Sequence, residues 1–186
     1  FNHKLNVPLS PFSICRALRM KPHEQNVHLA TVAKYTLRRF CQSDDNAILG
    51  FHVPQESVLS KEPSDRNAFK EEVVHIARKL WILAMNPKEK EVGIEHDYYQ
   101  KAFSLEGARI PGKYDVILVD EAQDMTPVNL DILRKQYGQK ILVGDSCQSL
   151  YQWKGSIDSL ETWDATHRLH LTKSFRFGAK IAECAN

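Results

Sequence analysis

The 186-residue sequence lacks several features that mark specialised protein classes. The sequence has four cysteines, which lie far apart without a Cys-x-x-Cys pair: Cys15, Cys41, Cys147 and Cys184. We therefore expect neither a zinc site nor a disulfide framework. We expect the thiols to be reduced, as in an intracellular protein. Eight Gly and eight Pro exclude collagen-like and low-complexity chains. No apolar run approaches the roughly 18–20 residues of a membrane span, and neither a signal peptide nor an initiator Met is present. We therefore expect no membrane partner. We also expect that residue 1 lies inside a longer protein.

Charge is distributed unevenly, although the formal net charge is only +2. Residues 1–40 contain one acidic residue, Glu24, against seven basic ones: Lys4, Arg16, Arg19, Lys21, Lys34, Arg38 and Arg39. Such a segment fits either an anionic partner or an ordinary solvated surface, and composition does not decide between them.

The first ~110 residues predict a mostly helical unit. A short helix is expected within residues 8–19, entered at Ser10-Pro11, and a second begins after Asn26 as its N-cap. A third runs from near Ser64 to just before Pro87, and a fourth covers residues 95–105. The apolar residues of the second and third helices recur at helical spacing: Leu29, Val32, Ala33, Leu37 and Phe40, then Phe69, Val73, Ile76, Leu80 and Leu83. Residues 42–63 predict a loop with one short strand near residues 48–53.

The pattern changes after Gly112, where short apolar runs alternate with helical segments. Residues 116–119 and 141–143 predict strands buried on both faces, and residues 168–172 a third strand. Thr126-Pro127 predicts the start of a helix and Gly138 its end, and further helical segments are expected at residues 157–163 and 178–185. This order predicts an α/β fold with a parallel sheet and right-handed crossovers.

Polar residues gather where the predicted strands end, which is the rim where open parallel sheets bind ligands. The three segments are Asp120-Glu121-Ala122-Gln123-Asp124, Gly144-Asp145-Ser146-Cys147-Gln148-Ser149 and Lys173-Ser174-Phe175-Arg176-Phe177-Gly178. Mg²⁺ needs only one or two carboxylates, so Asp120 suits it. Glu121 can deprotonate an attacking water, and Arg176 can neutralise charge on a transferred phosphoryl group. Asp-Glu after a strand also occurs in plain polar loops.

These segments resemble known motifs when they are taken together. Residues 120–124 resemble motif II, the Walker B segment, of the UvrD/Rep/PcrA family of superfamily-1A DNA helicases. Residues 144–155, with Gln148, Tyr151 and Trp153, resemble motif III, and residues 171–178 resemble motif IV as found in F-box DNA helicases and their microbial relatives. His96-Asp97-x-Tyr99 resembles a DNA-contacting segment of that subgroup, and this resemblance rests on four residues.

The resemblance implies a partial RecA-like, P-loop NTPase sheet (residues 111–186) after a helical 1B-like insertion (residues 1–110). It implies ATP and Mg²⁺ as cofactors and single-stranded or partly duplex DNA as partner. Asp120 would hold Mg²⁺, Glu121 would be the catalytic base, and Gln148 would sense the γ-phosphate. The remaining implied sites are Arg176 at the γ-phosphate, Phe175 and Asp145 at the nucleotide, and Tyr151, Trp153, Lys154, His96 and Tyr99 at DNA.

The sequence departs from the family pattern in places. Lys154 stands where Arg is usual, which replaces a bidentate contact with a point charge. Phe175 stands where many relatives have Tyr, and Ser146-Cys147 replaces a Pro-containing version. The segment Gly107 to Lys113 is similar in sequence to a phosphate loop. Tyr114, however, stands where that loop has the Ser or Thr whose small hydroxyl binds Mg²⁺, and it cannot replace that group. The family's phosphate loop and second RecA-like domain are therefore expected outside these residues, and the chain alone is expected to be inactive.

Two other function classes stay open from the sequence. A degenerate or split helicase remnant would bind DNA or a partner protein without hydrolysing ATP. A Mg²⁺-dependent nuclease would use Asp120, Glu121 and Asp124, but this leaves Gln148, Phe175 and Arg176 unexplained. The leading hypothesis is a fragment of an ATP-dependent DNA helicase or translocase acting in recombination or repair, with an intracellular location.

Overall fold

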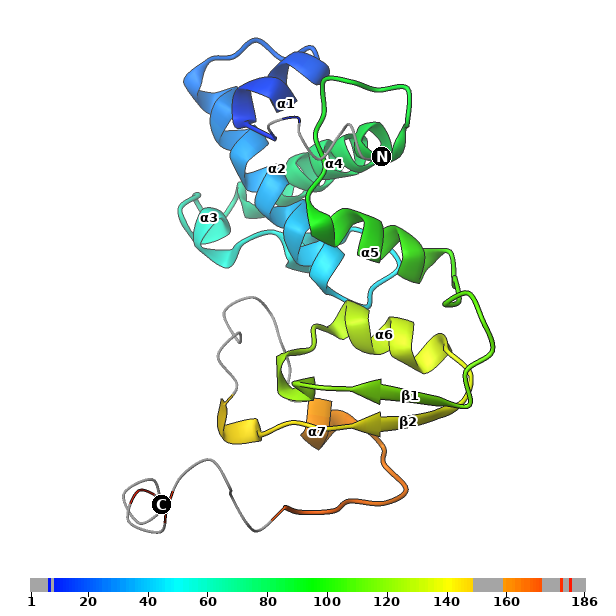
Figure 1. The fold of residues 1–186 in the computed structure, drawn as a ribbon. Coiled ribbons are helices and arrows are strands. Elements are labelled where there is room, and N and C mark those ends of the chain that lie inside the picture. The colour runs from blue at the N-terminus through cyan, green and yellow to red at the C-terminus, as the bar shows by residue number, and fades with distance from the viewer. Residues whose placement is uncertain (1–6, 8, 149–158, 172–177, 179–180, 182–186) are drawn as a thin grey trace.

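The computed structural model describes residues 7, 9–148, 159–171, 178 and 181 as a mostly helical protein with a small parallel sheet (Figure 1). The helices are α1 (Pro11–Ala17), α2 (Glu24–Gln42), α3 (Gln55–Leu59), α4 (Arg66–Met85), α5 (His96–Leu105), α6 (Pro127–Lys135) and α7 (Ser159–Thr162). The strands are β1 (Val116–Val119) and β2 (Gln139–Leu142), and the 3-10 turns are η2 (Gly50–His52), η3 (Ala122–Asp124) and η4 (Ser146–Gln148). None of the described helices is long and apolar enough to cross a membrane.

The apolar core lies within the helical part of the chain. One cluster of buried residues extends from Ile14 to Tyr98, and the predicted stripes of α2 and α4 supply much of it. The prediction for α1 is confirmed: Ser10 caps it, and Ser10 and Ser13 exchange side-chain-to-backbone hydrogen bonds. The predicted start of α2 is wrong, because the helix begins at Glu24, after His23. Asn26 instead lies inside the helix, where its side-chain amide donates to the carbonyl of Lys21.

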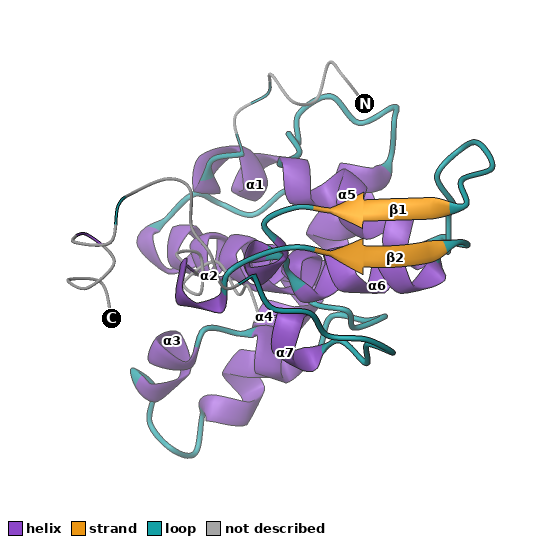
Figure 2. Ribbon diagram, turned by 60° about the horizontal axis from the view of Figure 1, so that its bottom comes forward, coloured by secondary structure: helices purple, strands orange, loops and turns teal. Residues whose placement is uncertain are grey.

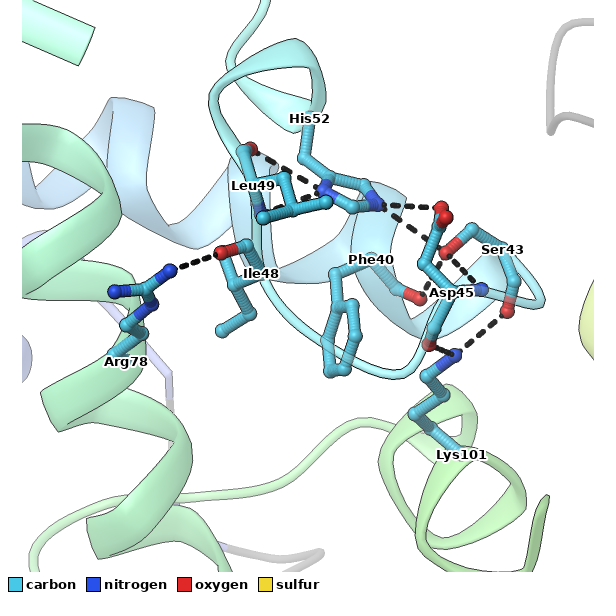
Figure 3. Close-up of polar contacts among 8 residues, drawn as sticks. All are labelled: Phe40, Ser43, Asp45, Ile48, Leu49, His52, Arg78 and Lys101. Carbon is cyan, nitrogen blue, oxygen red and sulfur yellow. Dashed lines mark hydrogen bonds and ion pairs between the residues drawn. The ribbon is translucent and has the colours of Figure 1, made fainter. Parts of the chain in front are cut away.

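A polar cluster fastens the loop after α2 to α5 (Figure 3). The ammonium of Lys101, fully buried on α5, donates to the carbonyls of Ser43 (2.8 Å) and Asp45 (2.5 Å) and lies 4.4 Å from the ring centroid of Phe40. His52 faces the Asp45 carboxylate through Nε2 at 3.1 Å. The strand predicted near residues 48–53 is wrong, because this segment forms the 3-10 turn η2. The Leu49 N–H donates to Nδ1 of His52 and closes the turn.

The two strands pair in parallel, with Val116 opposite Gln139 and Val119 opposite Leu142, and α6 connects them as predicted. Pro127 opens α6 after Thr126. Figure 2 shows both strands in front of α5 and α6. The other sheet face is open within the described part of the chain, so the expectation of burial on both faces is wrong. Leu118 is 72% exposed on that face, beside Ile141.

The third predicted strand is also wrong over its described residues. Residues 168–171 form no strand, and Leu169 and Leu171 are 93% and 94% exposed. Arg168 instead donates through its guanidinium to the carbonyls of Leu160 and Trp163 at the end of α7. Residues 172–177 and most of the helix predicted at residues 178–185 lie outside the described part of the chain.

Polar contacts join the sheet to the helical part. Ser104 of α5 donates to the Asp131 carboxylate of α6 at 2.5 Å, and Lys135 donates to the Ser104 carbonyl at 2.8 Å. Gln136, which is buried, accepts from the backbone N–H of Ile110 at 2.8 Å. In Figure 1, α5 and β1 run in opposite directions across the molecule. The first turn of α5 therefore lies toward the same side as the carboxyl ends of the strands.

Candidate functional site

Two loops lie next to each other at the carboxyl ends of β1 and β2. The pairing continues past the strands: the Val143 N–H donates to Val119 at 2.8 Å, and the Ala122 N–H donates to Val143 at 3.0 Å. Because the strands are parallel, Asp120 and Asp145 leave the sheet at the same edge. The structure thus brings together two of the three polar segments that the sequence places at one rim.

The first loop presents two carboxylates to solvent. Asp120 and Glu121 are both exposed, and the Asp120 Oδ1 atom accepts from the Glu121 backbone N–H at 3.0 Å. Glu121 has a left-handed backbone (φ 51°, ψ 42°), a conformation that non-glycine residues seldom adopt and that costs about 1–2 kcal/mol. Surrounding contacts therefore have to hold the chain in this turn.

Gln123 links this loop to the next one, and the sequence reasoning did not assign it a role. Its side chain is 1% exposed. The amide nitrogen donates to Oε2 of Glu121 at 2.6 Å, and the amide oxygen accepts from the backbone N–H of Asp145 at 3.0 Å. Gly144 permits this approach, because a Cβ atom there would lie 2.2 Å from the Gln123 oxygen. The position of Gln123 inside the 120–124 segment was the only feature of the sequence that could have indicated a functional role.

The second loop is organised by the Asp145 carboxylate. Its Oδ1 atom accepts from the Cys147 backbone N–H at 3.0 Å, and its Oδ2 atom accepts from the side-chain amide of Gln148 at 2.7 Å. Both Asp145 and Gln148 are exposed. Ser159 of α7, fully buried, donates to the carbonyl of Ala122 and so packs the next helix against the first loop.

His96 and Tyr99 form a separate exposed pair on the first turn of α5. The His96 Nδ1 atom lies 2.9 Å from the Tyr99 hydroxyl, and the two rings meet edge to face with centroids 5.7 Å apart. Such a pair presents an aromatic surface together with polar ring atoms.

Five predicted site residues lie outside the described part of the chain: Tyr151, Trp153, Lys154, Phe175 and Arg176. Among the described residues, no group of three or more His, Cys, Asp or Glu side chains could hold a metal ion. The exposed Asp120 carboxylate still suits Mg²⁺, which keeps most of its water shell and takes one or two carboxylates.

Known proteins that are similar to this chain are DNA helicases. A family model described as the UvrD/REP helicase N-terminal domain matches residues 83–161, a range that contains both loops. The chain is 36% identical over 164 residues to "F-box DNA helicase protein 1" of Schizosaccharomyces pombe, a match that covers 85% of this chain and 18% of that protein. It is 33% identical over 194 residues to "F-box DNA helicase 1" of Gallus gallus, which covers 96% of this chain and 18% of that protein. Residues 83–161 of the chain thus belong to the UvrD-like helicase family.

A bacterial relative extends the comparison. The chain is 32% identical over 145 residues to "DNA helicase IV" of Escherichia coli strain K12, a match that covers 71% of this chain and 21% of that protein. The chain thus spans about a fifth of the length of these UvrD-like relatives. No solved structure is significantly similar to it.

Proposed function

We propose that this chain is part of an ATP-dependent DNA helicase or translocase, in which ATP hydrolysis drives movement along single-stranded DNA during recombination or repair. The observation that carries the proposal is the Gln123 bridge, which joins the loop of Asp120 and Glu121 to the loop of Asp145 and Gln148. A phosphoryl-transfer site needs a metal-holding carboxylate, a base and a phosphate sensor close together, and these two loops offer those groups.

Each of the described loop residues has a proposed role. Asp120 would hold Mg²⁺, which when bound supplies positive charge to the phosphate oxygens. Glu121 would orient an attacking water and accept its proton, as an exposed carboxylate on a fixed turn is able to do. Gln148 would contact the γ-phosphate, with its amide oriented by the Asp145 carboxylate, and Asp145 itself would lie beside the nucleotide.

The roles of the residues outside the described part rest on the family resemblance. Phe175 would stack on adenine, and Arg176 would reach the γ-phosphate. Tyr151, Trp153 and Lys154 would contact DNA, where stacking on a base is worth about 1–3 kcal/mol and tolerates any sequence. The His96–Tyr99 pair would add a contact from the first turn of α5, which lies toward the same side as the carboxyl ends of the strands.

The domain division is part of the same proposal. Residues 1–110 would form the helical 1B-like insertion, in keeping with a core cluster that ends at Tyr98, and residues 111–186 would form part of a RecA-like motor domain. A phosphate loop and a second RecA-like domain would come from the remainder of the helicase. We infer an intracellular location from this function.

ATP-turnover and nuclease assays with and without single-stranded DNA test the proposal. We expect the 186-residue chain to hydrolyse ATP negligibly, since it contains no complete phosphate loop, and to bind single strands weakly. The protein expressed from the complete reading frame should show DNA-stimulated turnover. DNA binding without turnover in that protein would indicate a remnant that serves as a binding module, and Mg²⁺-dependent DNA cleavage would indicate a nuclease.

A further inference from the structure

We propose that Gln123 is a positioning residue that couples the candidate base Glu121 to the candidate sensor Gln148. The roles of Glu121 as base and Gln148 as phosphate sensor rest on the proposed function, but the hydrogen-bonded link between these residues is a property of the folded chain. It concerns a side chain that would touch neither nucleotide nor DNA and would act through its neighbours.

The first support is the pair of bonds that Gln123 makes. A glutamine amide has one donating and one accepting end, and here each end engages a different loop. The donor reaches the Glu121 carboxylate at 2.6 Å, while the acceptor receives the Asp145 backbone N–H at 3.0 Å. Hydrogen bonds to a charged group are stronger than neutral ones, so the Glu121 carboxylate has a preferred position.

The second support is the continuation of the bonds beyond Asp145. The same residue that donates to Gln123 through its backbone accepts from the Gln148 amide through its carboxylate at 2.7 Å. A continuous chain of hydrogen bonds therefore runs from Glu121 through Gln123 and Asp145 to Gln148. A displacement of Gln148 by a ligand would move Asp145 and, through Gln123, the Glu121 carboxylate.

The third support is the confinement of Gln123. Its side chain is 1% exposed, and it lies so close to Gly144 that a methyl group there would collide with its oxygen at 2.2 Å. Glu121 also has a left-handed backbone, which directs its side chain from a turn that few residues adopt. A buried amide with little room to rotate transmits a displacement instead of absorbing it.

The chain offers a matched control at the other end of the strands, just before β2 begins. Gln136 is also buried, and its amide also bonds at both ends, accepting from the Ile110 N–H and donating to the Ile132 carbonyl. Gln136 contacts neither candidate loop through these bonds. A substitution there removes a comparable buried amide without breaking the link between Glu121 and Gln148.

The test is an NMR comparison on the 186-residue chain without nucleotide, so its outcome does not depend on ATP hydrolysis. Glu121→Ala should shift the side-chain amide signals of Gln123 and Gln148 and the backbone amide signal of Asp145. In a Gln123→Glu background, which keeps the acceptor and loses the donor, Glu121→Ala should no longer shift the Asp145 and Gln148 signals. Gln136→Glu should leave those responses intact.

Two results would overturn the coupling: no response of Asp145 and Gln148 to Glu121→Ala, or an equal response in the Gln123→Glu background. If Gln123→Glu fails to fold, Gln123→Met supplies the uncharged background in which the same signals are compared. Loss of the proposed helicase function would instead appear as absent ATP turnover in the complete protein, with the NMR responses unchanged.

Discussion

The ammonium of Lys101 lies 2.8 Å from the carbonyl of Ser43, the residue that caps the carboxyl end of α2. A cation at a helix carboxyl end satisfies carbonyls that lack partners inside the helix, and here it also joins α5 to α2. Burial lowers the pKa of Lys101, and nearby acidic groups, including Asp45, partly oppose that effect. The hydrogen bonds to Ser43 and Asp45 therefore offset part of the cost of burying the charge.

Lys101→Met should destabilise the chain by about 1–3 kcal/mol, because two carbonyls lose a charged donor. Urea unfolding followed by circular dichroism measures this change. Lys79→Met is the matched control, since Lys79 is exposed on α4 and should change stability by less than about 0.5 kcal/mol. An equally stable Lys101→Met variant would contradict this prediction and show that the cost of burying the ammonium cancels the gain from its hydrogen bonds.

His52 should make stability depend on pH. Burial lowers the pKa of His52, with Lys101 acting in the same direction, while the Asp45 carboxylate and the Leu49 backbone oppose this shift. The Leu49 N–H donates to Nδ1, which fits the neutral ring with its proton on Nε2 facing Asp45. The unfolded chain therefore binds the proton more tightly than the folded chain, so stability is complete above about pH 6.5 and falls as the pH drops below that value.

Thermal unfolding at pH 7.5 and pH 5.5 checks this expectation. The difference between the two pH values should shrink in His52→Gln, even though that variant is less stable at both. His75→Gln is the control, because His75 is exposed on α4. A pH difference that is as large in His52→Gln as in the wild type would assign the effect to other groups.

Trp153→Ala should weaken binding of single-stranded DNA by about 1–3 kcal/mol, since one base would lose its stacking partner. Fluorescence anisotropy with a labelled oligonucleotide measures the affinity, which should also fall as salt rises because phosphates are neutralised on binding. Trp163→Ala is the control: the ring of Trp163 packs near Arg134 of α6, 5.7 Å from its guanidinium. Equal affinities for the two variants would remove Trp153 from the DNA site.

Local patterns in the sequence predicted much of the fold. The stripes of α2 and α4 and the Ser10 cap of α1 depend on residues a few positions apart, and each is found in the structure. The predicted start of α2 was wrong, since a helix that begins at Glu24, after an N-cap residue (His23) that makes no side-chain cap hydrogen bond, leaves no signal in the sequence.

Predictions that depended on distant partners were less successful. An apolar run such as residues 116–119 predicts a strand but does not say what covers it, and Leu118 is exposed. The segment at residues 168–171 has an apolar alternation, yet it pairs with neither β1 nor β2. Pairing depends on contacts that the local pattern does not contain.

The candidate site was predicted as residue types at strand ends, and parallel pairing of β1 and β2 brings Asp120 and Asp145 to one edge. The role of Gln123 was missed because burial and bonding to both loops arise only when the two loops meet. In the sequence it is one polar residue among several.

The most direct test of the proposed function is DNA-stimulated ATP hydrolysis by the protein expressed from the complete reading frame, with and without Glu121→Gln. Loss of the base should lower kcat by about 100-fold or more while KM for ATP changes little. Glu161→Gln, at an exposed glutamate of α7, should hydrolyse ATP like the wild type. Wild-type turnover in the Glu121→Gln protein, or no DNA-stimulated turnover in the wild type, would contradict the proposed function.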